Sequence, residues 1–188
     1  MRGKTSFLVL GLVTLLVFPL PALWALEYFE DIHFLEVLEL DNIFSPLTLI
    51  GLELGVIYAF IVISVGQLPA FETLSKQQRI LIEQLNLNWG DIIFISFCAG
   101  FGEEILFRAG IQHWLGPWIT SVLFIAVHGY FNPFSLKKSL HGFLILPFII
   151  LLAFAYEKFG LWFVVAAHFS YDLVLFSQVV TAKKPKRK

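Results

Sequence analysis

The amino-acid sequence predicts an all-α integral membrane protein, a bundle of about six transmembrane helices. Of its 188 residues, 58% are hydrophobic and 14% are charged, whereas soluble domains are about 45–50% apolar and about 25% charged. A soluble chain of this length would leave about 30% of its surface exposed to water. The apolar surplus therefore indicates that lipid is the solvent, and the mean hydropathy of +0.81 agrees with this.

The expected spans follow apolar runs of roughly the 20 residues that a helix needs to cross the hydrocarbon core. They are residues 6–26, 47–68, 92–108, 118–129, 140–156 and 161–180. The first has prolines near its outer end, the third becomes charged after Phe101, and the fourth is long enough only with its flanks. Between the second and third spans, residues 71–87 have an amphipathic pattern that predicts an interfacial helix, with Trp89 at headgroup depth.

We expect one membrane domain with three parts. Residues 1–90 hold two transmembrane helices and the amphipathic linker, residues 91–182 form a core with intramembrane polar residues, and residues 183–188 form a basic tail at the anionic leaflet. The N-terminus also resembles a signal peptide. Its apolar run is long for one, and the residues around Ala22 and Ala25 make a poor cleavage site, so we expect the first helix to be retained.

The basic residues predict the orientation of the chain. With the N-terminus inside, all thirteen Lys and Arg except Arg108 and Lys158 lie on the cytoplasmic side. This pattern predicts that both termini are cytoplasmic, and the compact six-span body fits a prokaryotic plasma membrane. The net charge of −1 favours no particular partner besides the lipid bilayer, and we expect no nucleic-acid partner.

The single cysteine excludes two classes of site. Cys98 has no partner for an intramolecular disulfide and cannot form a cysteine-based zinc cage. It lies in an apolar run, where a small buried hydrophobic side chain is the favoured interpretation and a nucleophile is the alternative.

Ionisable side chains within the expected spans are the main functional signal. Each costs about 2.5–3.5 kcal/mol to insert, so each needs a structural or chemical reason. On the third, fourth and sixth spans they are Glu103, Glu104, Arg108, His128, His168 and Asp172.

Their depths predict that these side chains meet. At about 1.5 Å of rise per residue, Glu103 lies roughly 18 Å from the cytoplasmic end of its span. From the outer side, His128 and Asp172 lie about 16 Å deep and His168 about 10 Å deep. All four positions therefore fall in the middle of a hydrocarbon core about 30 Å thick.

Helical spacing separates the two glutamates. Glu104 and Arg108 are four residues apart and share a face, so they can form a structural ion pair. Glu103 points about 100° away, with no local cation. Two adjacent carboxylates in a low dielectric repel each other, which favours a proton on one of them and makes Glu103 a candidate general base.

The other intramembrane polar residues have structural alternatives. A lone histidine in a span is more often a satisfied polar contact than a catalyst. Glu53, between Gly51 and Gly55, is interpreted mainly as a helix–helix contact, with a substrate or proton contact as the alternative. His33, His113 and His141 are expected in loops or at helix ends and are assigned no role. His168 and Asp172 share a helix face, so Asp172 can orient His168 or act beside it.

Three motifs in order along the chain resemble the CPBP family of intramembrane proteases, also called the CAAX-protease and bacteriocin-processing family. They are Glu-Glu-x-x-x-Arg, Phe-x-x-x-His and His-x-x-x-Asp, matched at Glu103, Glu104, Arg108, Phe124, His128, His168 and Asp172. The resemblance covers residues 100–172 and the last four spans. It implies a four-helix catalytic core and a glutamic-type intramembrane endopeptidase.

The resemblance also implies roles for individual residues. Glu103 would activate a water for attack on a peptide carbonyl, with His128 assisting. His168 and the residue at position 172 would stabilise the oxyanion. Some family members have Asn at this position, and an ionised Asp172 would repel an oxyanion. Asp172 must therefore be protonated, orient His168 or bind a metal.

Other mechanisms and functions fit the same residues. In a zinc-dependent version, Glu104, His128 and His168 would hold the ion and the other glutamate would act as base. We favour the version without a cofactor, because the His-Glu-x-x-His fingerprint is absent. A transporter or proton relay would usually show repeat symmetry or broken helices, and neither is evident.

A non-catalytic immunity or binding protein is a further alternative, which the intact set of candidate catalytic residues argues against. The expected substrate is a membrane-anchored protein or peptide. Within the family this includes prenylated CAAX proteins, bacteriocin precursors, signal peptides and C-terminal sorting tails.

Overall fold

The computed structural model describes residues 2–131 and 136–182, which are predominantly helical and contain no β-strand. The elements are α1 (Arg2–Leu16), α2 (Pro19–Glu30), α3 (Phe34–Leu38), the 3-10 helix η1 (Leu40–Asn42), α4 (Pro46–Gly66), α5 (Pro69–Gln84), α6 (Trp89–Glu104), the π-helix η2 (Ile105–Ile111), α7 (Gln112–Val127), α8 (Leu136–Phe159) and α9 (Leu161–Ala182). The predicted all-α fold class is confirmed. The predicted basic tail, residues 183–188, lies outside the described residues.

Four stretches of the described chain are long and apolar enough to cross a membrane. They are Gly3–Glu30, Pro46–Gly66, Ser139–Phe159 and Leu161–Gln178. The other two expected spans correspond to α6 with η2, which carries the intramembrane charges, and to α7, which has 16 residues. Together these helices support an integral membrane protein.

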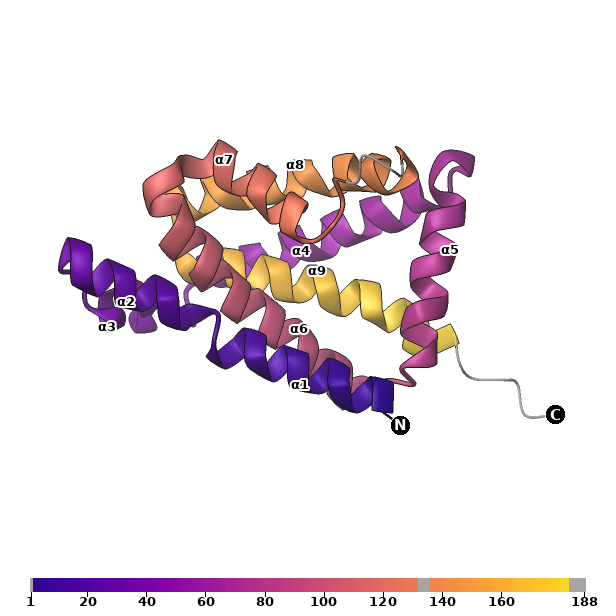
Figure 1. The fold of residues 1–188 in the computed structure, drawn as a ribbon, viewed down its shortest axis with the longest axis horizontal. Coiled ribbons are helices and arrows are strands. Elements are labelled where there is room, and N and C mark those ends of the chain that lie inside the picture. Colours follow the sequence, from indigo (N-terminus) through magenta and orange to yellow (C-terminus); the bar gives the residue numbers. More distant parts are fainter. Residues whose placement is uncertain (1, 132–135, 183–188) are drawn as a thin grey trace.

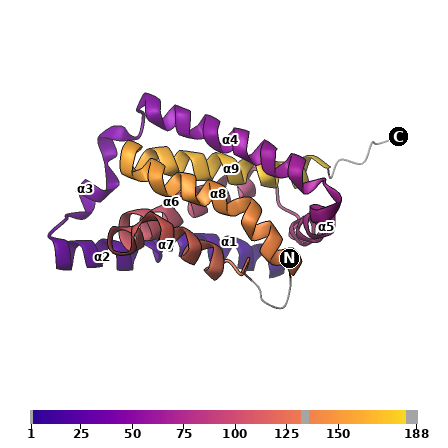
Figure 2. The same cartoon turned by 90° about the horizontal axis from the view of Figure 1, so that it is seen from above.

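Glycine allows the central helices to approach closely. Helix α9 packs most extensively against α4 and then against α6, and Figure 2 shows α8 and α9 lying between α4 on one side and α1, α2 and α7 on the other. A Cβ at Gly55 of α4 would overlap the carbonyl of Ala167 on α9, and one at Gly100 of α6 would lie 2.9 Å from the amide nitrogen of Phe169. Small residues at such contacts are typical of packed transmembrane helices. They bring the end of α6 to the middle of α9.

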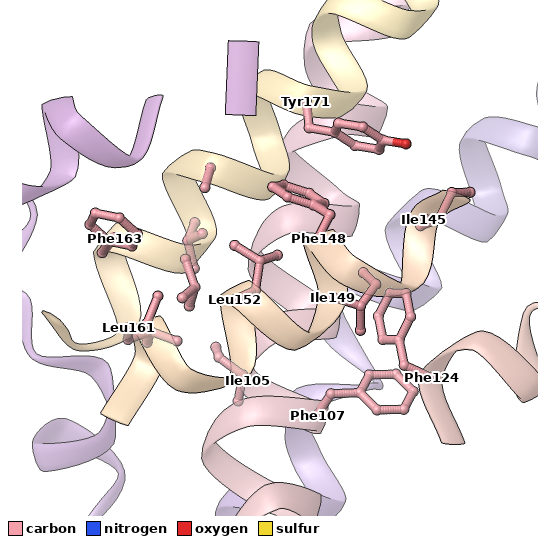
Figure 3. Packing of buried hydrophobic residues seen from close by; sticks show 14 of the residues in the cluster. Ile105, Phe107, Phe124, Ile145, Phe148, Ile149, Leu152, Leu161, Phe163 and Tyr171 are labelled. Atoms are coloured by element: carbon pink, nitrogen blue, oxygen red, sulfur yellow. The ribbon is translucent and has the colours of Figure 1, made fainter. Parts of the chain in front are cut away.

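A hydrophobic core fixes the remaining helices around α9. Phe148 and Leu152 of α8, Leu161 of α9 and Ile105 of η2 are fully or almost fully buried, and Figure 3 shows them meeting between these helices. Because lipid tails are as apolar as these side chains, close van der Waals packing, and not exclusion of water, holds such helices together. This packing holds η2, and with it the end of α6, against α8 and α9.

Two helices depart from the simple span pattern. The first expected span, residues 6–26, is divided into α1 and α2 at Val17 and Phe18, because Pro19 has no N–H to continue the helical hydrogen bonds. Helix α5 runs crosswise at one end of the bundle, near the N-terminus (Figure 1). At the same end, Lys4 of α1 forms an ion pair of 2.5 Å with Asp91 of α6. The crosswise direction suits the interfacial position that we predict for α5.

The close contact between α4 and α9 predicts the effect of adding one methyl group. Gly55→Ala would place a Cβ against backbone atoms of α9 and is expected to lower stability by about 1–3 kcal/mol, as overpacked cores do. Gly3→Ala is the control, because its Cβ would lie 3.5 Å from the Leu85 side chain and should change stability by less than about 1 kcal/mol. Unfolding by SDS in detergent micelles, followed by circular dichroism, measures both. Equal stabilities would contradict this account of the contact.

Candidate active site

The candidate active site lies where α6, α7 and α9 meet. Glu103 and Glu104 are the last two residues of α6, directly before the π-helix η2, a local structure often found at functional sites. His128 caps the C-terminus of α7, and His168 lies near the middle of α9. The accessible members of this group line one cavity of about 480 Å³. The structure thus brings the three sequence motifs together.

Glu104 joins two helices through a fully buried carboxylate. Its Oε2 accepts a hydrogen bond from Nε of Arg108 at 2.9 Å, and its Oε1 lies 2.7 Å from Nδ1 of His168. The ion pair with Arg108 is the one that the four-residue spacing predicts. Because the carboxylate accepts the hydrogen bond, Nδ1 of His168 carries the hydrogen. The other ring nitrogen, Nε2, faces Asp172 and lies 3.7 Å from its Oδ2.

Arg108 compensates the charge of Glu104 in a fully buried setting. Its guanidinium carbon lies 5.7 Å from the ring centroid of Phe124, a cation–π contact. The same phenylalanine ring stacks on His128 at 4.3 Å and contacts Phe107 at 4.8 Å. Phe124 therefore forms the wall that connects the buried ion pair to the second histidine.

Glu103 and His128 form a second carboxylate–imidazole pair, which is accessible from the cavity. Oε2 of Glu103 lies 3.4 Å from Nε2 of His128, and the two side chains are 13% and 33% exposed. Nδ1 of His128 lies 2.7 Å from the carbonyl of Phe124. A carbonyl only accepts, so Nδ1 donates and Nε2 faces Glu103. Water can reach this pair, whereas the carboxylate of Glu104 is shielded from it.

Asp172 lies close to His168 of α9 without forming a hydrogen bond to it. Its distance of 3.7 Å to Nε2 of His168 exceeds that of a hydrogen bond. Nδ1 of the same ring is engaged by Glu104. In this structure Glu104 therefore orients the ring of His168. This was one of the roles left open for Asp172.

Two other predictions are tested by burial. Cys98 is fully buried and lies outside the cavity lining, as the hydrophobic interpretation predicts. The main interpretation of Glu53 as a helix–helix contact is wrong, because this residue is exposed on α4. Gly51 and Gly55 face α9. Glu53 is two residues from each of them, so its side chain points about 200° away around the helix.

The residues of the alternative zinc set are not gathered as metal ligands among the described residues. No group of three or more His, Cys, Asp or Glu within the described chain has the geometry to hold a metal ion. Of the proposed ligands Glu104, His128 and His168, the first has both carboxylate oxygens engaged by neighbouring side chains.

Besides Thr14, whose hydroxyl donates to the carbonyl of Leu10, three further polar side chains line the same cavity: Tyr130, His141 and Tyr171. The sequence interpretation assigned no role to His141 and passed over both tyrosines. His141 lies within α8, where it is 6% exposed. The only sequence signal for the tyrosines is their position close to His128 and directly before Asp172.

Comparison with known proteins agrees with the geometry. Residues 85–174 match the family described as type II CAAX prenyl endopeptidase, Rce1-like. This range contains all three motifs. The matched segment is thus similar to the CAAX-protease family. The resemblance inferred from the motifs is thereby confirmed for this part of the chain.

Part of the chain is also similar to a protein of Bacillus subtilis (strain 168), the uncharacterised protein YpbD. It is 36% identical over 89 residues, which make up 47% of this chain and 45% of YpbD. The match therefore spans less than half the length of that relative. No solved structure matches the chain.

The buried ion pair predicts a large loss of stability when one partner is removed. Arg108→Ala leaves Glu104 buried without its cation and is expected to destabilise the protein by about 3–5 kcal/mol. Arg79→Ala is a matched control, because Arg79 and Glu83 are also four residues apart but lie on the exposed surface of α5. An exposed pair of this kind is worth about 0.3–0.5 kcal/mol. SDS unfolding of the two variants tests the difference, and similar losses would contradict it.

Proposed function

We propose that this protein is an intramembrane endopeptidase that hydrolyses a peptide bond of a membrane-associated protein or peptide. The observation that carries the proposal is the accessible Glu103–His128 pair on a cavity beside a second, buried carboxylate–imidazole pair. The family of the matched segment, a prenyl endopeptidase by description, supports the same reaction. In this proposal residues 91–182 form the catalytic core, and residues 1–90 support it.

Glu103 acts as general base in the proposed reaction. A water bound beside the pair can hydrogen-bond to Oε2 of Glu103 and to Nε2 of His128, which lie 3.4 Å apart. As the water oxygen bonds to the substrate carbonyl carbon, one of its protons passes to Glu103. When the C–N bond breaks, this proton is delivered to the departing amine, directly or through His128. General acid–base catalysis of this kind contributes about 10²–10⁴-fold to the rate.

His168 stabilises the oxyanion in the same proposal. Its Nδ1–H is held by Glu104 at 2.7 Å, and Asp172 lies 3.7 Å from its Nε2. Two flanking carboxylates stabilise a doubly protonated ring, whose Nε2–H can then donate to the developing negative charge. Asp172 contributes by stabilising that cation, whose positive charge offsets the repulsion between the Asp172 carboxylate and the oxyanion.

The substrate is expected to be apolar or attached to the membrane, because most of the residues that line the cavity are apolar. The prenylated CAAX proteins, bacteriocin precursors, signal peptides and sorting tails of the family all meet this condition. We further propose that the protein lies in a prokaryotic plasma membrane with both termini in the cytoplasm, from the distribution of its basic residues.

Glu103→Gln tests the assignment of the base. The amide keeps the size of the side chain but cannot accept the proton of water, so cleavage should fall at least about 100-fold while folding is retained. Glu83→Gln on the exposed side of α5 is the control and should leave cleavage unchanged. A terminal-peptide comparison of membrane proteins from cells that express each variant measures product formation. Processing that survives Glu103→Gln would refute the protease assignment.

We propose that catalysis requires no metal cofactor, since the site residues do not form a metal-binding group. Treatment of the purified protein with 1,10-phenanthroline should therefore leave peptide cleavage within about twofold of the untreated rate. A zinc enzyme would lose its activity and regain it on addition of Zn²⁺, and this outcome would favour the alternative mechanism.

A further inference from the structure

We propose that Tyr130, His141 and Tyr171 form a second binding site in the cavity, which holds a neutral peptide carbonyl of the substrate close to the scissile bond. The inference rests on the proposed protease function and extends it to substrate positioning. None of the three residues belongs to the motifs that define the catalytic groups.

Tyr171 provides the strongest evidence, because its hydroxyl is buried and unpaired. The residue is 6% exposed, and the hydroxyl has no hydrogen-bond partner within the described part of the chain. Its ring packs 4.7 Å from that of Phe148. Figure 3 shows the hydroxyl directed away from the packed cluster, to the side on which Ile145 lies. Ile145 and Tyr171 both line the cavity, so a molecule that enters it would come close to this residue.

A neighbouring tyrosine shows what a satisfied hydroxyl looks like in the same cluster. Tyr58 lies 6.3 Å from Tyr171, ring to ring, and donates its hydroxyl to the carbonyl of Leu144 at 3.1 Å. Burying a hydroxyl without a partner costs about 1–3 kcal/mol. Tyr171 carries this cost while Tyr58 does not, and a bound ligand would remove it.

Two other polar residues of this proposed site, His141 and Tyr130, line the same cavity. His141 is 6% exposed, and its Nδ1 also has no partner among the described residues. The ring of Tyr130 lies 5.5 Å from that of His141 and 6.5 Å from that of His128. Tyr130 lines the same cavity as Tyr171, Asp172 and Glu103. The three side chains therefore adjoin the catalytic groups on one side.

The chemistry of Tyr130, His141 and Tyr171 favours an uncharged hydrogen-bond acceptor as the ligand. The tyrosine hydroxyls can donate, and they lie in a cavity otherwise lined mostly by apolar residues. The carboxylates of Glu103 and Asp172 on the same cavity would repel an anion. A peptide carbonyl is uncharged and accepts two hydrogen bonds. Since consecutive residues of an extended chain are about 3.3–3.6 Å apart, such a carbonyl one or two residues from the scissile bond would lie next to the catalytic pair.

Tyr171→Phe, with Tyr58→Phe as the matched control, tests this positioning role. The probe is a synthetic peptide that spans the cleavage site mapped by terminal-peptide comparison. Tyr171→Phe should raise KM about 3–10-fold with kcat nearly unchanged, the loss expected for one neutral hydrogen bond of about 0.5–1.5 kcal/mol. It should not lower stability, because it removes an unsatisfied group. Tyr58→Phe should lower stability and leave KM unchanged.

Binding of the same peptide in the Glu103→Gln background separates this inference from the proposed function. Adding Tyr171→Phe to that variant should weaken binding by the same 3–10-fold, whatever the rate of cleavage. Cleavage that is independent of Glu103 overturns the proposed function. A Glu103-dependent reaction in which Tyr171→Phe leaves KM and binding unchanged overturns the second binding site alone and indicates that water occupies it.

Discussion

The arrangement of the site depends on the buried carboxylate of Glu104. A charge in this position is stable only when it is paired on all sides, and its two oxygens face Arg108 on its own helix and His168 on α9. The three side chains can therefore be buried only together. This fixes the rotation of α6 relative to α9, which Gly100 allows to approach closely. The neighbouring Glu103 is thereby turned toward the cavity and His128.

Two carboxylate–imidazole pairs of the same composition thus differ in their surroundings. The pair of Glu104 and His168 is shielded and held by Arg108, which suits it to keep a fixed charge and a fixed ring orientation. The pair of Glu103 and His128 is longer and open to the cavity, which suits it to bind water and exchange protons. In the proposed mechanism burial, more than residue type, separates the two roles.

Much of this arrangement could be predicted from local sequence patterns. Hydropathy located the apolar helices, and the spacing of Glu104 and Arg108 gave an ion pair that the structure contains. The contact of Glu104 with His168 could not be predicted, because it joins residues on different helices and depends on how closely α6 and α9 pack. The cavity group of Tyr130, His141 and Tyr171 was missed for the same reason. Glu53 was misinterpreted because a glycine on each side suggested a contact face, whereas both glycines face α9 and Glu53 is exposed.

The π-helix after Glu104 also affects where the chain length can vary during evolution. A π turn accommodates more residues per turn than an α-helix, so deletion of one residue within Ile105–Ile111 would restore the regular pitch. The helical faces before and after η2 would then keep nearly the same relation, so Phe124 and the histidine at the end of α7 would keep their direction. Deletion of one residue from the regular part of α6 would instead rotate Glu103 and Glu104 by about 100° relative to the start of that helix. Related sequences with this site should therefore tolerate a change of length in η2 better than one in α6.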